Sequence, residues 1–408
     1  MMKFDYDDSL TRQDALSGLI DNWKCTPQTH EMLLENAFGR VLAQDTYAQY
    51  SLPVVRSSKR DGIAVRSSDF KDGMPDTSKW RRGRDFISAD TGDDFSDEFD
   101  AVITIEEVSF DEAGRLTIHK QPHEIVAGFG VNSSGSLVEK SSPIVEKNTK
   151  LTPELISALA IGGYKKVEVY KKPVVAFIPT GSELVAYGTP PERGQNIDSN
   201  SLLVKGFLEE VGAQVECFPI IKDDKNRLEE MLKKALAFSD IVLINGGSSR
   251  GEEDFNSLLI KQHASYFKHG VRAVPGRPIG MAIIEGKPVI NIPGPAAAAS
   301  LALSWLVNGL VFHYYGLNVP KPHIVEAYLE EDIGKPVLFE RLCRVSLKQD
   351  DTGRYFCCPL SSPLGVPQII EKTQGMLVLP IGSEGAKKGE QVSVVVLRPL
   401  SGISKMSY

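Results

Sequence analysis

Two short apolar runs, each ending in a polar and glycine-rich turn, constrain this fold more than any other feature of the chain. They are residues 174–178 (VVAFI) and 241–244 (IVLI). Such runs are typical of parallel strands that are buried on both faces of a sheet. Apolar residues at helical spacing over 199–211 and 226–238 predict right-handed strand–helix–strand connections. We therefore expect a doubly wound α/β domain around these two strands.

The chain is too long for a single hydrophobic core. It has 408 residues, whereas one domain usually holds about 100–200. Short β-prone runs broken by glycine, proline and aspartate lie both before and after the α/β region. We predict a multidomain α/β and β protein with these parts: a split helical domain (1–52 and 139–172), an inserted β domain (53–138), an α/β domain (173–320) and a C-terminal β barrel (321–408).

Capping residues and apolar spacing locate the helices of the split domain. Thr11 lies at the start of segment 9–23, whose apolar residues recur at helical spacing. A second helix is expected over 30–42. A third is expected to begin at Pro153, because the preceding Thr152 is a favourable N-cap and proline is favourable at the first helical position.

Composition argues against several functional classes. The formal net charge of −7 does not suit a general nucleic-acid-binding protein, which needs a basic face. The chain lacks a positively charged start followed by an apolar core, so we expect no secretory signal. Five scattered cysteines without CxxC spacing fit reduced thiols in the cytoplasm. The most apolar stretch, 296–312, is short for a membrane span of roughly 20 residues, so we expect a buried helix.

The turns that follow the two strands form the predicted binding site. In an open parallel sheet, ligands bind beyond the carboxyl ends of the strands, so turns 179–184 and 245–254 should face one crevice. We expect each turn to lead into a helix whose N-terminus favours an anion. Glycines let backbone N–H groups approach that anion closely, although they also suit ordinary tight turns. The glycines concerned are Gly181, Gly246, Gly247 and Gly251.

Three carboxylates beside these glycines indicate a divalent cation. Phosphates and carboxylates repel one another unless a hard cation lies between them, and Mg²⁺ with oxygen ligands and waters suits that position. We interpret Glu183 and Asp254 as Mg²⁺ ligands, either directly or through water. Asp198, close to Asn200, is assigned mainly to ordering its own turn. Without a ligand, the same acids would serve as helix caps.

Four motifs in this order resemble those of one protein family. Each motif is weak alone, but their ordered combination is specific. The matches are SSKRDGIAV (57–65) with SAMDGYAV, TGSEL (180–184) and NIDSNS (196–201) with TGDEL…I.DSNS, GGSSRGEED (246–254) with GGVSVGEXD, and PGRP (275–278) and IPGP (292–295) with PGKP…LPGNP. The chain thus resembles the MoeA and gephyrin E-domain family, the molybdopterin molybdenumtransferases, over nearly its whole length.

The resemblance implies an enzyme of molybdenum cofactor biosynthesis. Family members are homodimers with a cleft lined by both subunits, and they insert molybdate into adenylylated molybdopterin, releasing AMP and requiring Mg²⁺. It implies Asp61, contributed by the partner subunit, as a catalytic residue with Glu183 and Asp254. A MogA-like adenylyltransferase is a further expected partner, and no nucleic acid or membrane is expected. The expected substrate-binding residues are Thr91, Thr180, Gly181, Ser182, Asp198, Asn200, Gly246, Gly247, Ser249, Arg250, Gly251, Arg277, Pro293 and Gly294.

Several motif positions depart from the family pattern. Arg60 and Ile63 replace a methionine and a tyrosine, Arg277 replaces the lysine of PGKP, and Pro295 replaces the asparagine of PGNP. Arginine keeps the positive charge but presents a planar fork of donors instead of a point charge. Together with Arg250, these changes indicate a more cationic pocket and a divergent paralogue.

Three other interpretations remain open. The first is a protein that binds molybdopterin or the finished cofactor and carries it without turnover, which the altered PGNP motif favours. The second rests on the α/β domain alone, which also resembles the MogA adenylyltransferase and the N-terminal domain of CinA-type proteins; the surrounding domains argue against it. The third is a structural scaffold, a role that the gephyrin E-domain also has in neurons.

Overall fold

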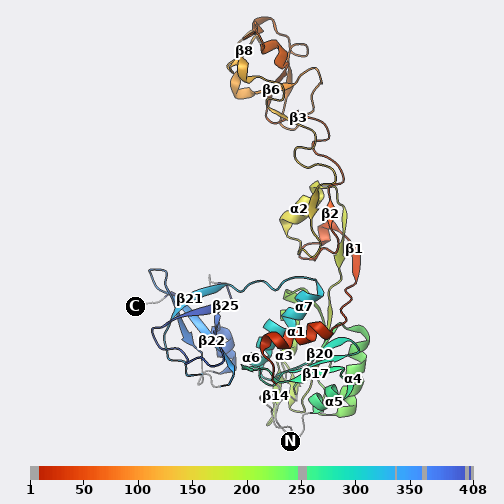
Figure 1. The fold of residues 1–408 in the computed structure, drawn as a ribbon, viewed down its shortest axis with the longest axis vertical. Coiled ribbons are helices and arrows are strands. Elements are labelled where there is room, and N and C mark those ends of the chain that lie inside the picture. Colours follow the sequence, from red (N-terminus) through yellow and green to blue (C-terminus); the bar gives the residue numbers. More distant parts are fainter. Residues whose placement is uncertain (1–8, 247–254, 336–337, 361–364, 400–403, 406–408) are drawn as a thin grey trace. The chain divides into compact units, whose positions relative to one another are not determined.

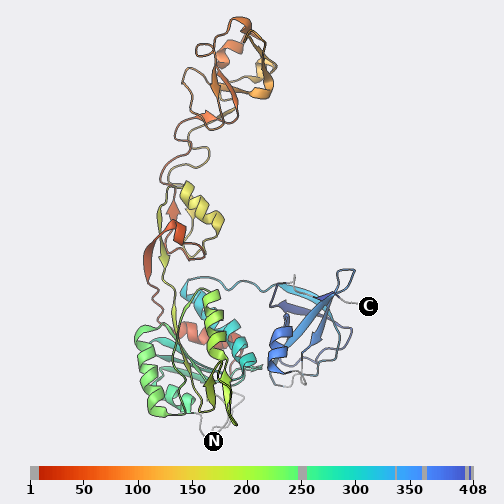
Figure 2. The same cartoon turned by 180° about the vertical axis from the view of Figure 1, so that it is seen from behind.

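The chain forms two compact units. The computed structural model describes residues 9–246, 255–335, 338–360, 365–399 and 404–405 (Figures 1 and 2). One unit is Thr29–Tyr170, and the other combines Met1–Gln28 with Lys171–Tyr408. Each unit contains hydrophobic clusters of its own, so each has the core that a folded body needs.

A six-stranded sheet forms the centre of the second unit. Its first four strands pair in parallel and its last two pair antiparallel. The predicted doubly wound α/β fold is confirmed, and both apolar runs are parallel strands in its interior. The order across the sheet is β15 (Gln214–Cys217), β12 (Val174–Pro179), β16 (Ile241–Asn245), β20 (Lys287–Ile292), β19 (Gly280–Ile284) and β17 (Tyr266–His269).

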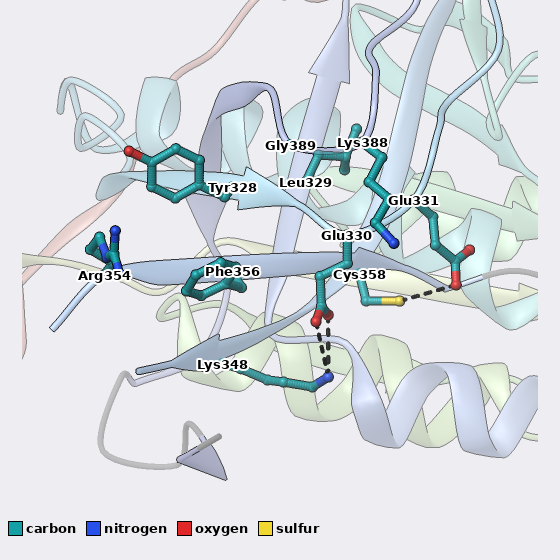
Figure 3. Close-up of a pocket in the computed structure, with 10 residues that line it drawn as sticks. All are labelled: Tyr328, Leu329, Glu330, Glu331, Lys348, Arg354, Phe356, Cys358, Lys388 and Gly389. Carbon is teal, nitrogen blue, oxygen red and sulfur yellow. Dashed lines mark hydrogen bonds and ion pairs between the residues drawn. The ribbon is translucent and has the colours of Figure 1, made fainter. Parts of the chain in front are cut away.

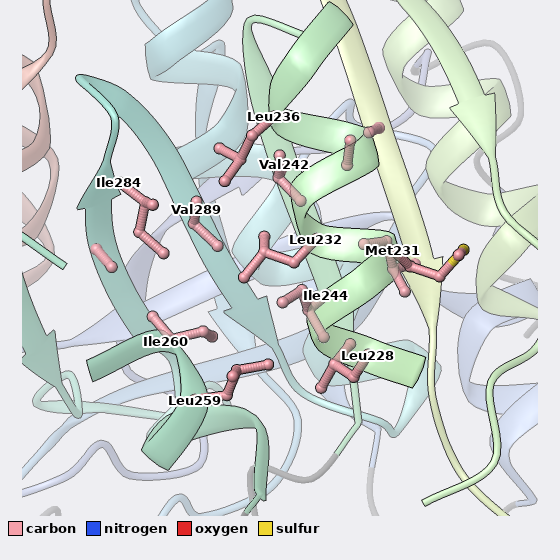
Figure 4. Packing of buried hydrophobic residues seen from close by; sticks show 14 of the residues in the cluster. Leu228, Met231, Leu232, Leu236, Val242, Ile244, Leu259, Ile260, Ile284 and Val289 are labelled. Atoms are coloured by element: carbon pink, nitrogen blue, oxygen red, sulfur yellow. The ribbon is translucent and has the colours of Figure 1, made fainter. Parts of the chain in front are cut away.

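Helices α4 (Lys225–Phe238) and α5 (Phe255–His263) pack against this sheet (Figure 4). The carboxylate of Asp224 caps α4, because it accepts hydrogen bonds from the backbone N–H groups of Asn226 and Arg227. Apolar residues of α4 recur every three or four positions and are buried on the strands. Full burial of a leucine or methionine side chain contributes roughly 1.5–3 kcal/mol to stability. These residues are Leu228, Met231, Leu232, Ala235 and Leu236.

The remaining helices of this unit pack on one another and on the sheet. α3 (Asn200–Glu210) contacts β12 and α6 (Ala296–Ala302). α1 (Arg12–Asn22) begins as predicted after Thr11, which accepts a hydrogen bond from the backbone N–H of Asp14. α1 contacts β19, the π-helical turn η6 (Leu303–Val307) and α7 (Asn308–Tyr314). Residues 12–22 therefore pack on the α/β unit, although the sequence suggested that they belong to the split domain.

The predicted buried helix is present. In the part of the chain that the structure describes, one helical run, Ala296–Tyr314, has the length and apolar composition of a membrane span. Slightly more than half of it, 56%, is buried inside the protein. Its contacts with α1 and α3 show why its sequence is apolar: it is a core helix of the α/β unit.

The first unit contains more strand and less helix than expected. The predicted helix over residues 30–42 is wrong: Thr29–Leu33 is strand β1, followed by a short 3₁₀ turn at Leu34–Asn36. β1 pairs antiparallel with β11 (Lys166–Tyr170), and its side chains alternate between exposed and half-buried. The pairing partner lies far away in the sequence, so local spacing cannot reveal it. The predicted helix after Thr152 is confirmed as α2 (Pro153–Ile161).

The inserted β region has a small core of its own. β4 (Gly62–Val65) lies between β5 (Ile87–Ala89) and β6 (Ala101–Thr104) in a three-stranded sheet. Apolar side chains of β4 and β6 pack with those of a neighbouring hairpin. Shorter pairings complete the first unit: β7 (Val108–Phe110) with β8 (Leu116–Ile118), β3 (Ser57–Ser58) with β9 (Val131–Asn132), and β2 (Thr46–Tyr47) with β10 (Pro143–Val145).

The C-terminal β barrel is also confirmed. It closes because β22 pairs with both β23 and β24. β18 (Ala273–Val274) pairs with β22, and Arg12 forms an ion pair with Glu340, so the barrel is tied to the α/β sheet. The barrel elements are β21 (Ile324–Leu329), β22 (Glu340–Gln349), β23 (Tyr355–Pro359), α8 (Val366–Lys372), β24 (Gly375–Leu379) and β25 (Gln391–Val396). β26 (Ser404–Lys405) adds to β22, and β13 (Leu184–Ala186) pairs with β14 (Asn196–Asp198) near the sheet.

A cavity of about 670 Å³ lies on the outside of this barrel (Figure 3). Tyr328 and Phe356 form its aromatic wall, with ring centroids 5.7 Å apart. Lys348 and Glu330 form an ion pair beside them. None of the residues predicted to bind substrate lines this cavity.

The first prediction concerns a half-buried acid at the start of β16. We expect Asp240→Asn to raise the melting temperature at neutral pH and to lose that advantage in acid. Burial raises the pKa of Asp240, against the opposing effects of the Val174 backbone N–H and Lys287. A group whose pKa is raised in the folded state stabilises the protein at low pH. That stabilisation is lost as the pH rises through the folded-state pKa. The charge is therefore unfavourable at neutral pH, and asparagine removes it while still accepting from Val174.

Thermal unfolding at neutral pH and at about pH 3.5, below the ordinary aspartate pKa, checks this expectation. Asp332→Asn is the control of opposite sign, because hydrogen bonds from Lys388 and Lys387 lower the pKa of Asp332. That variant should be less stable than wild type at neutral pH and should approach it in acid. A constant difference between Asp240→Asn and wild type at both pH values would contradict the prediction.

Candidate active site

The ends of three parallel strands meet at one rim of the α/β sheet. β12, β16 and β20 are neighbours, and they are followed by Thr180, Gly246 and Pro293. The backbone N–H of Thr180 donates to the carbonyl of Asn245 over 2.8 Å, and its hydroxyl donates to the same carbonyl over 2.9 Å. The two motif turns therefore start side by side, as the sequence predicted.

Two glycines at this rim are required by the backbone. Gly246 has a φ of +115°, and a Cβ on it would lie 2.4 Å from the carbonyl oxygen of Thr180. Gly181 has a φ of +147°, and a Cβ there would lie 2.7 Å from a carboxylate oxygen of Glu183. The positive φ disfavours a larger residue at both positions, and at Gly246 the close backbone carbonyl also excludes one. Glu183 thus folds its carboxylate back over the first turn.

Asparagines hold the strand ends together. The amide of Asn200 donates to Asn245 Oδ1 over 2.9 Å and to the carbonyl of Gly294 over 2.6 Å. The amide of Asn245 donates to the carbonyl of Pro293 over 2.9 Å. Asn256 donates to the Thr180 hydroxyl over 3.0 Å. These asparagines are nearly fully buried. The sequence pointed to Asn200, but it did not single out Asn245 or Asn256.

The first turn differs from its predicted form in two ways. It leads into strand β13, not into a helix, so no helix N-terminus follows Gly181. The backbone N–H of Ser182 donates to the carboxylate of Asp223 over 3.0 Å, and the Ser182 hydroxyl accepts from the Asp223 N–H over 3.1 Å. The Asp223 carboxylate therefore occupies a donor that was expected to receive a substrate anion. The sequence did not single out Asp223.

Asp198 orders its turn, as predicted. It is buried, and it accepts hydrogen bonds from the backbone N–H of Ser201 over 3.1 Å and from the Ser201 hydroxyl. These bonds fasten the start of α3, and they place Asn200 in the rim. Asp198 therefore acts on the site through the backbone and through Asn200.

The predicted metal ligands are only partly described. Asp254 lies outside the described residues, as do Gly247, Ser249, Arg250 and Gly251. Within the described residues, no group of three or more His, Cys, Asp and Glu side chains is placed to hold a metal ion. Glu183 is exposed, and its carboxylate makes no hydrogen bond or ion pair with the described part of the chain. A single oxygen ligand with open positions for water is compatible with Mg²⁺, which keeps several waters.

Arg277 contacts the barrel. Its guanidinium lies over the ring of Phe339, with its carbon 4.9 Å from the ring centroid, and its carbonyl accepts from the backbone N–H of Val271. Arg272, the other arginine of this segment, donates to the Ser9 hydroxyl over 3.3 Å. The two arginines therefore contact other segments of this unit: Arg277 contacts Phe339 at the start of the barrel, and Arg272 contacts Ser9 in the N-terminal segment.

Asp61 lies in the first unit, in a turn set by its own neighbours. Gly62 follows it, and a Cβ on Gly62 would lie 1.9 Å from the carbonyl oxygen of Ile103, so only glycine fits. The backbone N–H and the hydroxyl of Thr91 both donate to Asp61 Oδ1, over 2.7 and 2.9 Å. These bonds, the backbone one first, lower the pKa of Asp61. Thr91, expected to contact substrate, thus orients Asp61.

A second carboxylate accompanies Asp61. Glu106 accepts a hydrogen bond from the hydroxyl of Thr104 over 2.7 Å, which lowers its pKa. The charge of Arg60 lowers that pKa further, whereas the charge of Asp61 raises it. Glu106 therefore lies close enough to Asp61 and Arg60 for their charges to affect its pKa. Asp61 remains ionised at neutral pH, so it can act as a charge or a ligand but not as a proton donor.

Comparison with known proteins identifies the family. Residues 10–163 match the MoeA N-terminal region (domain I and II), and residues 176–313 match a probable molybdopterin binding domain. The chain belongs to the MoeA family. A molybdopterin molybdenumtransferase of Staphylococcus epidermidis is 28% identical over 380 residues, covering 89% of this chain and 90% of that protein. The Staphylococcus aureus enzyme of the same name is 26% identical over 401 residues and covers 94% of both chains.

Solved MoeA structures share the fold. A molybdopterin biosynthesis MoeA protein from Pyrococcus horikoshii superposes with a TM-score of 0.80 at 26% identity, covering 96% of this chain and 100% of that chain. Another MoeA structure, from Pyrococcus horikoshii OT3, gives a TM-score of 0.75 at 24% identity. The family and the fold that the motifs predicted are therefore confirmed, although this member departs from the family pattern at several motif positions.

The departures from the MoeA pattern have structural explanations in two places. Ile63 is buried in the core of the inserted β region, so an aliphatic side chain at this position packs well. Arg277 stacks on Phe339, which a planar guanidinium does better than an ammonium group. Pro295 is the N-cap of α6, where it makes no side-chain capping hydrogen bond. The asparagine amide of the family motif is thus absent from the start of α6.

Proposed function

We propose that this protein inserts molybdate into adenylylated molybdopterin and releases AMP, as the last step of molybdenum cofactor synthesis. The observation that supports this most is full-length similarity to relatives named molybdopterin molybdenumtransferase, together with retention of the Asp61, Glu183 and Asn200 motifs. The rim at β12, β16 and β20 offers buried amides and close backbone approach, which suit a nucleotide–pterin substrate.

Several of the described residues have a defined part in this proposal. Asn200 and Asn245 keep the ends of β16 and β20 in register, so they hold the substrate-binding edge in shape. Thr91 orients Asp61 and keeps it ionised. Glu183 and Asp254 are proposed to hold Mg²⁺, which when bound neutralises substrate phosphate charge. Substrate phosphates would then lie beside carboxylates without net repulsion.

We propose that two copies of the chain form a homodimer in the cytoplasm, as the resemblance to the MoeA family implies. In the proposed cleft, one subunit would supply Asp61 and its partner would supply the rim of the α/β sheet. A MogA-like adenylyltransferase would supply the adenylylated pterin. In this arrangement neither unit alone would be active.

The carrier interpretation remains the second candidate, and one contact favours it. The Ser182 N–H is occupied by Asp223, which leaves fewer donors in the first turn for a transition-state anion. A protein with this turn would still bind a pterin through the asparagine rim. Turnover is the property that separates the two candidates.

Reconstitution tests the proposed function. Purified protein is mixed with molybdate, Mg²⁺ and adenylylated molybdopterin, and both AMP and active cofactor are measured. We expect AMP and cofactor in equal amounts, and no AMP when EDTA replaces Mg²⁺. Tight pterin binding without AMP release would support the carrier instead, and the absence of both binding and turnover would contradict both functions.

A further inference from the structure

The strand register sets the layout of the cavity on the outside of the barrel (Figure 3). β21 pairs in parallel with β23, and β23 pairs antiparallel with β22, so Tyr328, Phe356 and Lys348 lie side by side across the three strands. Cys358 lies two residues further along β23, and Glu330 follows the end of β21. Side chains two residues apart on a strand point to the same face, so these five face outward together. The residues between them belong to the barrel core: Leu329, Leu347 and Cys357.

Two aromatic rings offer a stacking surface in this cavity. Tyr328 and Phe356 are half-buried, and their rings are tilted by 38° with centroids 5.7 Å apart. Neither ring belongs to the apolar cluster inside the barrel. Exposed aromatic faces of this kind bind planar groups, and every nucleobase has such a face.

The charged groups of the cavity are paired unequally. Lys348 Nζ lies 3.2 Å from a carboxylate oxygen of Glu330, so these two form an ion pair. The Cys358 thiol donates to the carboxylate of Glu331 over 3.7 Å. Burial raises the pKa of this thiol, as do Glu331 and Glu330, so the thiol keeps its proton. Lys388, in contrast, makes no ion pair or side-chain hydrogen bond with the described part of the chain.

Arg354 lies at the opposite end of the cavity from Lys388 (Figure 3). Its Nε donates to the carboxylate of Asp350 and to the hydroxyl of Thr352, each over 3.0 Å. The Asp350 side chain is 1% exposed, whereas that of Arg354 is 59% exposed. The terminal nitrogens of the guanidinium make no hydrogen bond with the described residues. They are therefore available to an anion, and their planar arrangement matches two oxygens of a phosphate.

The unpaired groups select an anion that carries a planar ring. Both acids of the cavity already accept a hydrogen bond from a neighbour in it, whereas Arg354 and Lys388 have donors to spare. A bare anion would leave the two rings uncovered, and an uncharged ring would leave the guanidinium unpaired. Arg354 to Cys358 spans about 13 Å of strand, which gives room for a base, a sugar and a phosphate. The cavity volume of about 670 Å³ lies within the range of small-molecule sites, roughly 300–1,000 Å³.

We propose that this cavity is a second ligand site that takes a nucleoside monophosphate, with its base on Tyr328 and Phe356 and its phosphate on Arg354. Lys388 adds positive charge at the opposite end. The inference does not rest on the proposed function, because the cavity shares no residue with the rim. AMP, the product in the proposed function, is one member of this ligand class.

Isothermal titration calorimetry of the full-length protein with AMP and with GMP tests the inference. We expect both to bind, because stacking on a ring face tolerates either base. Tyr328→Leu combined with Phe356→Leu removes the rings but keeps apolar side chains, and should weaken binding by about tenfold or more. Tyr328→Phe keeps the ring and should bind as wild type does. Arg354→Gln keeps a donor for Asp350 but removes the cationic fork, and should weaken binding by about tenfold.

Arg227→Gln is the matched control for Arg354→Gln. The Arg227 side chain is 57% exposed and forms an ion pair with one acid, Glu230, but it lies on α4. Its nucleotide affinity should equal that of wild type. Adenosine and inorganic phosphate, titrated separately, should each bind more weakly than AMP, because each lacks one of the two recognised groups. Melting temperatures of all variants show whether a loss of binding reflects a loss of fold.

The outcomes decide the inference either way. Wild-type protein that binds neither nucleotide overturns it. Unchanged affinity in the double leucine variant also overturns it, because the nucleotide then binds elsewhere, as at the rim. AMP affinity equal to that of adenosine or of phosphate overturns it as well. If the double leucine variant unfolds early, Arg354→Gln decides: weaker binding at the wild-type melting temperature supports the site, and unchanged binding overturns it.

Discussion

The Asp61→Ala variant is expected to lose roughly 100-fold or more of the molybdate insertion rate while it keeps the wild-type melting temperature. Thr91 donates two hydrogen bonds to one carboxylate oxygen of Asp61, which fixes the carboxylate and keeps it ionised. The other oxygen has no partner in the described chain, so it is available to a metal-bound water or to substrate. Asp61 is exposed, so its removal leaves no buried group unpaired.

Asp76 provides a matched control in the same unit. Its carboxylate accepts from the backbone N–H and the hydroxyl of Ser78, over 3.1 and 2.5 Å, and it is also exposed with a lowered pKa. Asp76→Ala therefore removes the same pair of bonds away from the motif. Initial rates of AMP release and thermal unfolding would be measured for both variants. Equal rates in Asp61→Ala and Asp76→Ala would remove Asp61 from the catalytic residues.

The second large effect is expected for Asn245→Ala. Asn245 is 2% exposed and links three segments: it donates to the carbonyl of Pro293 and accepts from the amide of Asn200. Alanine leaves the buried Pro293 carbonyl without its partner. We expect a loss of about 2–3 kcal/mol in the free energy of unfolding, or roughly 5–10 °C in melting temperature. Pterin binding should weaken too, because the end of β20 is no longer held against β16.

Thermal unfolding and pterin titration measure these two effects. Asn22→Ala is the control, because the Asn22 amide also donates to a carbonyl, that of Gly18, but does so on the exposed surface of α1. Its melting temperature should stay close to that of wild type. If Asn245→Ala unfolds at the wild-type temperature, the hydrogen bonds of Asn245 do not stabilise the ends of these strands. If it unfolds earlier but binds pterin normally, the link is structural only.

The fold was predictable wherever the signal was local. Apolar runs predicted β12 and β16, and helical spacing with capping residues predicted α1, α2, α3 and α4, because these patterns follow from backbone geometry. Short β-prone runs predicted the inserted β region and the barrel, and the ordered motifs predicted the family. The predicted helix over residues 30–42 failed because β1 pairs with β11, which lies more than a hundred residues away.

The candidate site was predictable only in outline. Gly181, Gly246 and Asp198 were found by motif, and the structure places all three in turns at this rim, where the two glycines have positive φ and Asp198 accepts hydrogen bonds from Ser201. The prediction that the first turn leads into a helix was wrong, because strand β13 follows it. The Ser182 N–H that was expected to bind a substrate anion instead donates to Asp223, which lies in another segment. Asn245, Asn256 and Asn291 carry no local signal, since an asparagine at the end of a strand is usually a turn residue.

The sequence by itself determined the parallel strands, the capped helices and the family, because periodicity, caps and ordered motifs depend on residues close together in the chain. The tertiary structure alone decided how four buried asparagines are used. Three bridge strand ends, whereas neither polar atom of the Asn291 amide has a hydrogen-bond partner in the described chain, and both outcomes depend on which distant groups each amide meets. A buried polar group is stable only when its partners are in place, and those partners come from segments that only folding brings together.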